Sequence, residues 1–101
     1  MADQSTLNKI RNYASLGYSP QRIADLLALS PEDSARMVLL ITTEGTDLST
    51  YYRQGIVIGD YNKDVELTKL AEKGDISAIS MLSERQHERE VSDLKRDLFN
   101  V

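Results

Sequence analysis

The 101-residue chain has 12 basic and 16 acidic side chains, a net charge of −4, and no cysteine, so disulfides and thiolate chemistry are excluded. This length allows one domain, or a small domain with a helical extension, and the negative charge argues against strong nonspecific nucleic-acid binding. No apolar run approaches the roughly 18 residues that would span a membrane, and the N-terminus has no signal-peptide core, so we expect a soluble protein.

Three short helices are predicted in the first half of the chain. The first covers residues 4–16, with Leu7, Ile10 and Ala14 on one face, and Gly17 suits the left-handed position after its end. The second and third each begin with a Ser-Pro pair, and they cover residues 20–28 and 31–44. Ser at the N-cap accepts a hydrogen bond from a first-turn N–H, and Pro at the first helical position has no N–H to satisfy.

The second and third helices have the pattern of a helix-turn-helix. Ile23, Leu26 and Leu27 are predicted to face inward from the second helix, and the stretch Met37 to Ile41 is apolar on every side. We therefore expect the third helix to be covered by more than the first two. Two short helices joined by a tight turn are typical of a DNA-recognition unit.

The second half of the chain predicts a long helical hairpin. Thr46 or Asp47 is expected to cap a helix over residues 48–73, and the Lys73-Gly74-Asp75 turn to lead into a last helix over residues 76–99. Gly55 and Gly59 lie four residues apart inside the long helix, which suggests that another helix crosses closely there. The last helix is highly charged, and we expect ion pairs along it, including Arg89 with Asp93 and Asp93 with Arg96.

Apolar side chains surround the long helix rather than lining one stripe, which predicts that it is covered on several sides. A chain of this size offers few covering elements, so neighbouring copies are the expected cover, unless the N-terminal helices fold back over the helix within one monomer. The residues assigned to oligomerisation are Tyr51, Tyr52, Gly55, Ile56, Ile58, Gly59, Tyr61, Leu70, Ile76, Ile79 and Leu82.

Two segments together resemble the small subunit of phage terminase, the DNA-packaging recognition component. One is GYSPQRIADLLALSPEDSARM; the other is YYRQGIVIGDYNKDVELTKLAEKGDISAISMLSER, in which Ala71, Gly74, Asp75, Ala78, Ile79, Leu82 and Arg85 carry the resemblance. The resemblance implies a non-catalytic protein of the bacterial host cytoplasm. Such a protein assembles into a homo-oligomeric ring, binds packaging-site double-stranded DNA and engages the large terminase subunit.

The candidate DNA contacts come from the first 45 residues. Arg pairs bidentately with guanine, and Gln with adenine, in the major groove. The six candidates are Lys9, Arg11, Gln21, Arg22, Ser34 and Arg36. Residues 1–45 carry four basic and five acidic side chains, so a single copy would bind weakly and an assembly would recover affinity through linked sites. The alternative from the residues alone is a three-helix packing unit with solvated arginines.

These features predict an all-α protein with three parts. Residues 1–45 form a helix-turn-helix three-helix unit, 46–85 an antiparallel helical hairpin for oligomerisation, and 86–101 a charged helical tail. Val91, Leu94 and Leu98 form a stripe on that tail which could dock a partner, such as the large subunit, or form a short coiled coil.

No residue pattern points to catalysis, a cofactor or a metal. The single histidine, His87, lies in a charged run, and no phosphate-binding glycine loop is present. Two alternatives to the terminase interpretation stay open: a small dimeric helix-turn-helix transcription regulator, and a protein-binding helical adaptor whose acidic helix start, at Glu32 and Asp33, repels DNA.

Overall fold

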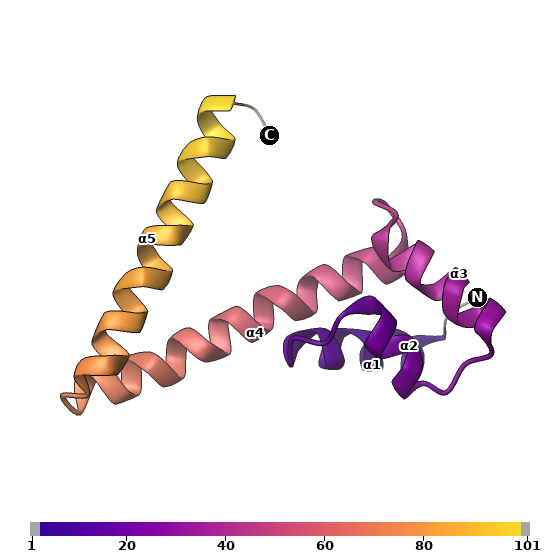
Figure 1. Cartoon of the computed structure of the whole chain (residues 1–101), viewed down its shortest axis with the longest axis horizontal. Coiled ribbons are helices and arrows are strands. Elements are labelled where there is room, and N and C mark those ends of the chain that lie inside the picture. Colours follow the sequence, from indigo (N-terminus) through magenta and orange to yellow (C-terminus); the bar gives the residue numbers. More distant parts are fainter. Residues whose placement is uncertain (1–2, 100–101) are drawn as a thin grey trace. The chain divides into compact units, whose positions relative to one another are not determined.

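The computed structural model describes residues 3–99, apart from the side chain of Phe99, and within that range the chain forms helices joined by short turns, with no strand. The five helices are α1 (Gln4–Ser15), α2 (Pro20–Leu26), α3 (Pro31–Thr42), α4 (Asp47–Glu72) and α5 (Ile76–Phe99), drawn in Figure 1. The predicted all-α class is therefore confirmed, and each predicted helix boundary lies within two residues of the observed one. Residues 100 and 101 of the predicted tail lie outside the described residues.

Local capping chemistry explains why each helix begins where it does. Ser19 Oγ accepts a hydrogen bond from the Arg22 amide at 3.3 Å, and Ser30 Oγ accepts one from the Asp33 amide at 3.2 Å. Thr46 caps α4 through the Ser49 amide, and Asp75 caps α5 through the Ala78 amide. These bonds satisfy donors that would otherwise have no partner within the helix.

The chain forms two compact units that divide inside α4, between Tyr61 and Asn62. The sequence analysis placed the first division at residues 45 and 46 instead. The difference arises because the N-terminal half of α4 packs onto the core of the first unit, through Leu48 and the half-buried Tyr51 and Tyr52. The turn before α4 therefore does not mark the boundary between the two compact units.

The core of the first unit is built from one face of each of its four helices. Ile10 and Ile23 are its largest fully buried side chains. The buried residues that pack together are Leu7 and Ile10 from α1, Ile23 and Ala24 from α2, Met37 and Ile41 from α3, and Leu48 from α4. Figure 1 shows α1, α2 and α3 gathered beside the first part of α4. This packing fixes α2 against α3.

One prediction about this core was wrong. Leu26, predicted to face inward, is 50% exposed, because it lies about 160° around the helix from the buried Ala24, whereas Leu27 lies about 60° from Ala24. Leu39 on α3 is 64% exposed, but the expected cover from beyond the first two helices is present, because Leu48 of α4 packs in one cluster with Met37 and Ile41. Only Met37 and Ile41, four residues apart, are buried.

Gly55 and Gly59 provide the predicted close crossing, and the helix that crosses them is α1 of the same chain. A Cβ added at Gly55 would collide with the Arg11 carbonyl oxygen, and one at Gly59 with the Ser15 carbonyl oxygen. Both glycines are buried. The sequence analysis assigned them to contacts between copies, but α1 occupies the space beside them.

The second unit contains the end of α4 and all of α5, joined by the turn at residues 73–75. Gly74 in this turn has φ +88°, a left-handed conformation that glycine adopts without strain. Ala78 is buried in this unit. No helix within residues 3–99 combines the length and apolar character that crossing a membrane requires.

Candidate nucleic-acid interface and association surfaces

The six candidate DNA contacts come from three helices of the first unit. Gln21 and Arg22 lie on α2, Ser34 and Arg36 on α3, and Lys9 and Arg11 on α1. Four of the six, Lys9, Gln21, Arg22 and Arg36, are exposed, while Arg11 and Ser34 are half-buried. These exposures decide which of the candidates a DNA duplex could reach.

Gln21 and Ser34 are brought together although 13 residues separate them in sequence. Gln21 Nε2 donates to Ser34 Oγ at 3.2 Å and to Asp25 Oδ1 at 3.1 Å. The contact connects the start of α2 with the first turns of α3. Both side chains can donate and accept hydrogen bonds, so this is the point at which two of the candidates form one polar surface.

Each arginine on α2 and α3 has one close neighbour with which it interacts. The Arg22 guanidinium lies 5.9 Å from the centre of the Tyr18 ring, within the range of a cation–π contact. Arg36 Nη1 lies 4.0 Å from Asp33 Oδ1, with 61% of the Arg36 side chain exposed. This long, exposed ion pair contributes little energy, so Arg36 can exchange it for another anion at small cost.

Arg11 is held by its own chain rather than directed to solvent. Its Nη2 donates to Asn8 Oδ1 at 3.2 Å, and its guanidinium lies 5.2 Å from the centre of the Tyr51 ring on α4. A phosphate contact from Arg11 would disrupt both interactions. Lys9, exposed on the same helix, has no such constraint.

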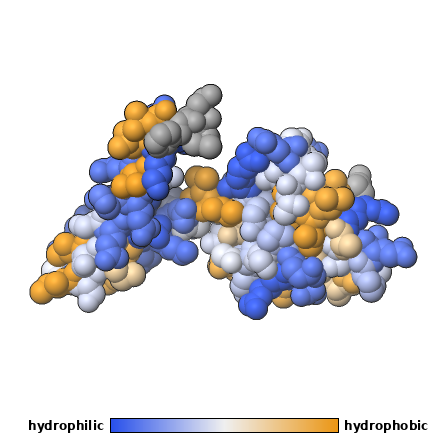
Figure 2. Space-filling view, turned by 45° about the horizontal axis from the view of Figure 1, so that its top comes forward, coloured by the Kyte–Doolittle hydropathy of each residue, from blue (hydrophilic) through white to orange (hydrophobic). Residues whose placement is uncertain are grey.

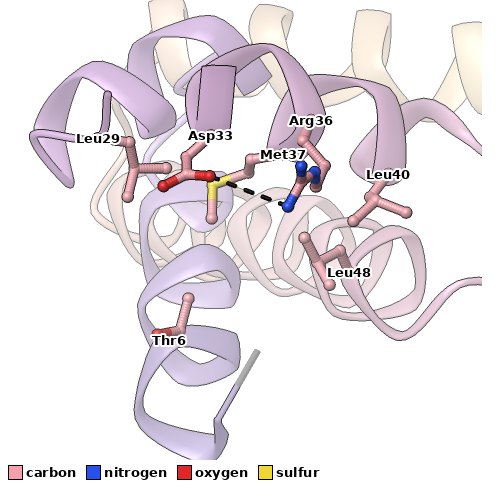
Figure 3. Close-up of a pocket in the computed structure, with 7 residues that line it drawn as sticks. All are labelled: Thr6, Leu29, Asp33, Arg36, Met37, Leu40 and Leu48. Atoms are coloured by element: carbon pink, nitrogen blue, oxygen red, sulfur yellow. Dashed lines mark ion pairs between the residues drawn. The ribbon is translucent and has the colours of Figure 1, made fainter. Parts of the chain in front are cut away.

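A hollow of about 240 Å³ lies beside this surface in the first unit. Figure 3 shows Arg36 and Asp33 together at this hollow, with their ion pair drawn as a dashed line. Its other lining residues are Thr6 of α1, Leu29 before α3, Met37 and Leu40 of α3, and Leu48 of α4. The hollow is lined mainly by apolar groups, and its polar lining residues are Thr6, Asp33 and Arg36.

The residues assigned to oligomerisation fall into two groups. Tyr51, Tyr52, Gly55 and Gly59 pack within the first unit, where the Tyr51 hydroxyl accepts from Gln4 Nε2 at 3.2 Å. The other residues lie at the surface: Ile56, Ile58, Tyr61, Leu70, Ile76 and Ile79 are exposed, and Leu82 is half-buried. Figure 2 shows apolar surface next to hydrophilic surface on the face in view.

A cluster that the sequence analysis missed holds α4 to α5 in the second unit. Asp64 Oδ1 accepts from Arg85 Nε at 2.7 Å, and Asp64 Oδ2 accepts from Arg89 Nη2 at 2.8 Å. The hydrogen bond from Arg85, and then that from Arg89, lower the pKa of Asp64 below its ordinary value. The predicted pair of Arg89 with Asp93 is therefore replaced, while the predicted pair of Asp93 with Arg96 is present at 3.2 Å.

A signal for this cluster does exist in the sequence. Asp64 and Arg85 lie at nearly equal distances on either side of the turn at residues 73–75, as two facing positions of a helical hairpin must. Opposite charges at such positions indicate a contact between the helices, whereas the sequence analysis considered charges only within α5.

Comparison with known proteins adds no relative. No model of a known family matches this chain, and the curated proteins and the solved structures likewise give no match.

Proposed function

We propose that this protein is a non-catalytic DNA-recognition and assembly subunit of a phage genome-packaging terminase. It binds double-stranded DNA through α2 and α3, which act as a helix-turn-helix with α3 as the recognition helix. Several copies assemble into a ring, and the ring passes the DNA to the large motor subunit in the cytoplasm of the bacterial host. The resemblance of the two sequence segments to terminase small subunits is the basis for naming this machine.

The observation that carries the DNA contact is the polar surface formed by Gln21 and Ser34. Their 3.2 Å contact joins α2 to α3, and the exposed Arg22 and Arg36 come from the same two helices. Arg and Gln are the side chains that read guanine and adenine edges in the major groove. Lys9 is the remaining phosphate contact, and we remove Arg11 from the set because it is engaged by Asn8 and Tyr51.

Charge balance explains why this function needs several copies. Asp25 and Asp33 lie beside Gln21 and Arg36 respectively, so the local charge around the two arginines is nearly neutral. One unit therefore gains little from phosphate neutralisation. Multiple units on one assembly raise the effective concentration of each later contact, which turns weak single contacts into stable binding.

The test of this proposal is DNA binding by full-length Arg36→Ala. We expect its affinity for packaging-site DNA to fall roughly 5- to 150-fold, the cost of losing one bidentate base contact. Lys69→Ala is the matched control, because it also removes one positive charge but lies in the second unit, beside Glu66. Unchanged DNA affinity of a folded Arg36→Ala protein would show that α3 is not the recognition helix.

The acidic start of α3 favours one other function, that of a protein-binding helical adaptor. Glu32 and Asp33 both lie in the first turn of α3, where DNA phosphates would otherwise approach the helix N-terminus. An adaptor of this kind would bind no DNA even at low salt, which separates it from the terminase subunit.

A further inference from the structure

The helix α5 presents two opposite faces. One face contacts its own unit: Ala78 is buried, Leu82 is half-buried, and Arg85 and Arg89 bind Asp64 of α4. These four residues are spaced by four, three and four positions, so they form a single stripe along the helix. This stripe identifies the side of α5 that α4 covers.

The other face carries Val91, Leu94 and Leu98. At 100° per residue they lie roughly 140° to 200° around the helix from Arg89, which is the side away from Asp64. Val91 is 36% exposed, Leu94 57% and Leu98 67%, and Figure 2 shows exposed apolar surface on this part of the molecule. No part of the described second unit covers this stripe.

The stripe has the spacing and side-chain types of a two-stranded coiled coil. Val91 and Leu98 occupy a positions of a heptad and Leu94 occupies d. A β-branched residue at a with Leu at d favours two parallel strands. The stripe is short, but α5 is already helical and anchored through Asp64, so pairing does not carry the cost of helix nucleation.

The charges flanking the stripe select a second copy of the same helix, in parallel. Glu90 is at g and Lys95 is at e, and neither forms an ion pair with any residue the structure describes. In a parallel, in-register pair, Glu90 of each copy faces Lys95 of the other. An antiparallel pair would instead bring Glu90 opposite Asp97 and Lys95 opposite Glu88, so that the repulsion between the two carboxylates would offset the attraction of the second pair.

We propose that the C-terminal half of α5 pairs with the same segment of a second copy as a parallel, in-register coiled coil centred on Val91 and Leu94. The pairing leaves Arg85 and Arg89 free to hold Asp64, because they lie on the opposite face. It does not depend on DNA binding, so it can be tested separately from the proposed function.

Disulfide cross-linking of the full-length chain tests this pairing, because the native sequence contains no cysteine. Val91→Cys places one thiol on the stripe with little change in volume, and Ser92→Cys places one on the neighbouring exposed position outside it. We expect Val91→Cys to form covalent dimers roughly tenfold faster or more, since pairing holds its thiols at high effective concentration. Equal rates for the two variants would overturn the proposal.

Two further experiments test the parallel direction and the register. A mixture of Val91→Cys and Leu94→Cys should form mixed dimers more slowly than Val91→Cys alone, and faster mixed cross-linking would show antiparallel pairing and overturn the proposal. Glu90→Lys in the Val91→Cys background should slow dimer formation about threefold to tenfold, because two pairs become repulsive. Adding Lys95→Glu should restore the rate, and a further decrease instead would contradict the register.

Discussion

At the scale of single residues, the two buried glycines of α4 have the clearest structural role. Gly55 and Gly59 allow α1 to approach the α4 backbone, with carbonyl oxygens of Arg11 and Ser15 occupying the space that a Cβ would need. A backbone carbonyl within a helix cannot move aside as a flexible side chain can. The glycines therefore stabilise the first unit through packing, although each costs its helix about 1 kcal/mol relative to Ala.

Gly55→Ala should therefore destabilise the protein, even though Ala is the better helix former. We expect the free energy of unfolding to fall by about 1–3 kcal/mol, the usual cost of overpacking a tight contact. Thermal unfolding followed by far-UV circular dichroism measures the change. Gln54→Ala, at the exposed neighbouring position, is the control and should be nearly neutral. A more stable Gly55→Ala protein would show that α1 does not pack there.

At the scale of helices, the connection between α4 and α5 depends on Asp64. Its hydrogen bonds with Arg85 and Arg89 lower its pKa from the ordinary value of 3.8. A carboxyl group with a lowered folded-state pKa stabilises the fold above its unfolded-state pKa, and this contribution disappears as the pH falls through the folded-state value. The contact between α4 and α5 is thus expected to weaken only in acid below about pH 3.8.

Asp64→Asn should weaken the contact between α4 and α5 at neutral pH, as acid does in the wild-type protein. We expect the free energy of unfolding to fall by roughly 0.5–1 kcal/mol, because the ion pairs are only partly shielded from water. The measurement is amide hydrogen exchange, which should become faster in the first turns of α5. Asp93→Asn, which removes an exposed pair within one helix, should have a smaller effect. If the wild-type protein and Asp64→Asn still differ in stability well below the folded-state pKa of Asp64, the ion pairs of Asp64 do not cause that difference.

Sequence reasoning succeeded for helices whose ends are determined by local chemistry. The Ser-Pro pairs, Thr46 and Asp75 each cap a helix through a bond three residues away, and Gly17 and Gly74 adopt the predicted left-handed turns. Ala28 was not predicted to have positive φ (+54°), because the left-handed position after a helix is usually occupied by glycine or asparagine.

Contacts between helices were predicted less well, for a physical reason. Periodicity indicates which residues share a face but not which helix that face contacts. Gly55 and Gly59 were correctly expected beside a crossing helix, yet they were assigned to a second copy rather than to α1. In the candidate DNA surface, the residues themselves were predicted from the sequence. The hydrogen bond between Gln21 and Ser34 and the cation–π contact of Arg11 with Tyr51 were not predicted, because both join residues that only the fold brings together.

At the scale of the whole molecule, the number of copies distinguishes the proposed functions. Exposed apolar side chains such as Ile56, Tyr61 and Ile76 remain on the described chain and provide surface for association. Native mass spectrometry of the full-length protein should detect a closed assembly of more than two copies, with an even number if α5 helices pair. A dimer would favour a transcription regulator, and a monomer at all concentrations would contradict both.

Binding of the wild-type protein to double-stranded DNA, measured over a series of salt concentrations, tests the DNA-recognition function most directly. We predict saturable binding at low salt, with an affinity that falls steeply and linearly on a log–log plot against salt as phosphate contacts are lost. No detectable binding at low salt by the folded, assembled protein would contradict the DNA-recognition function.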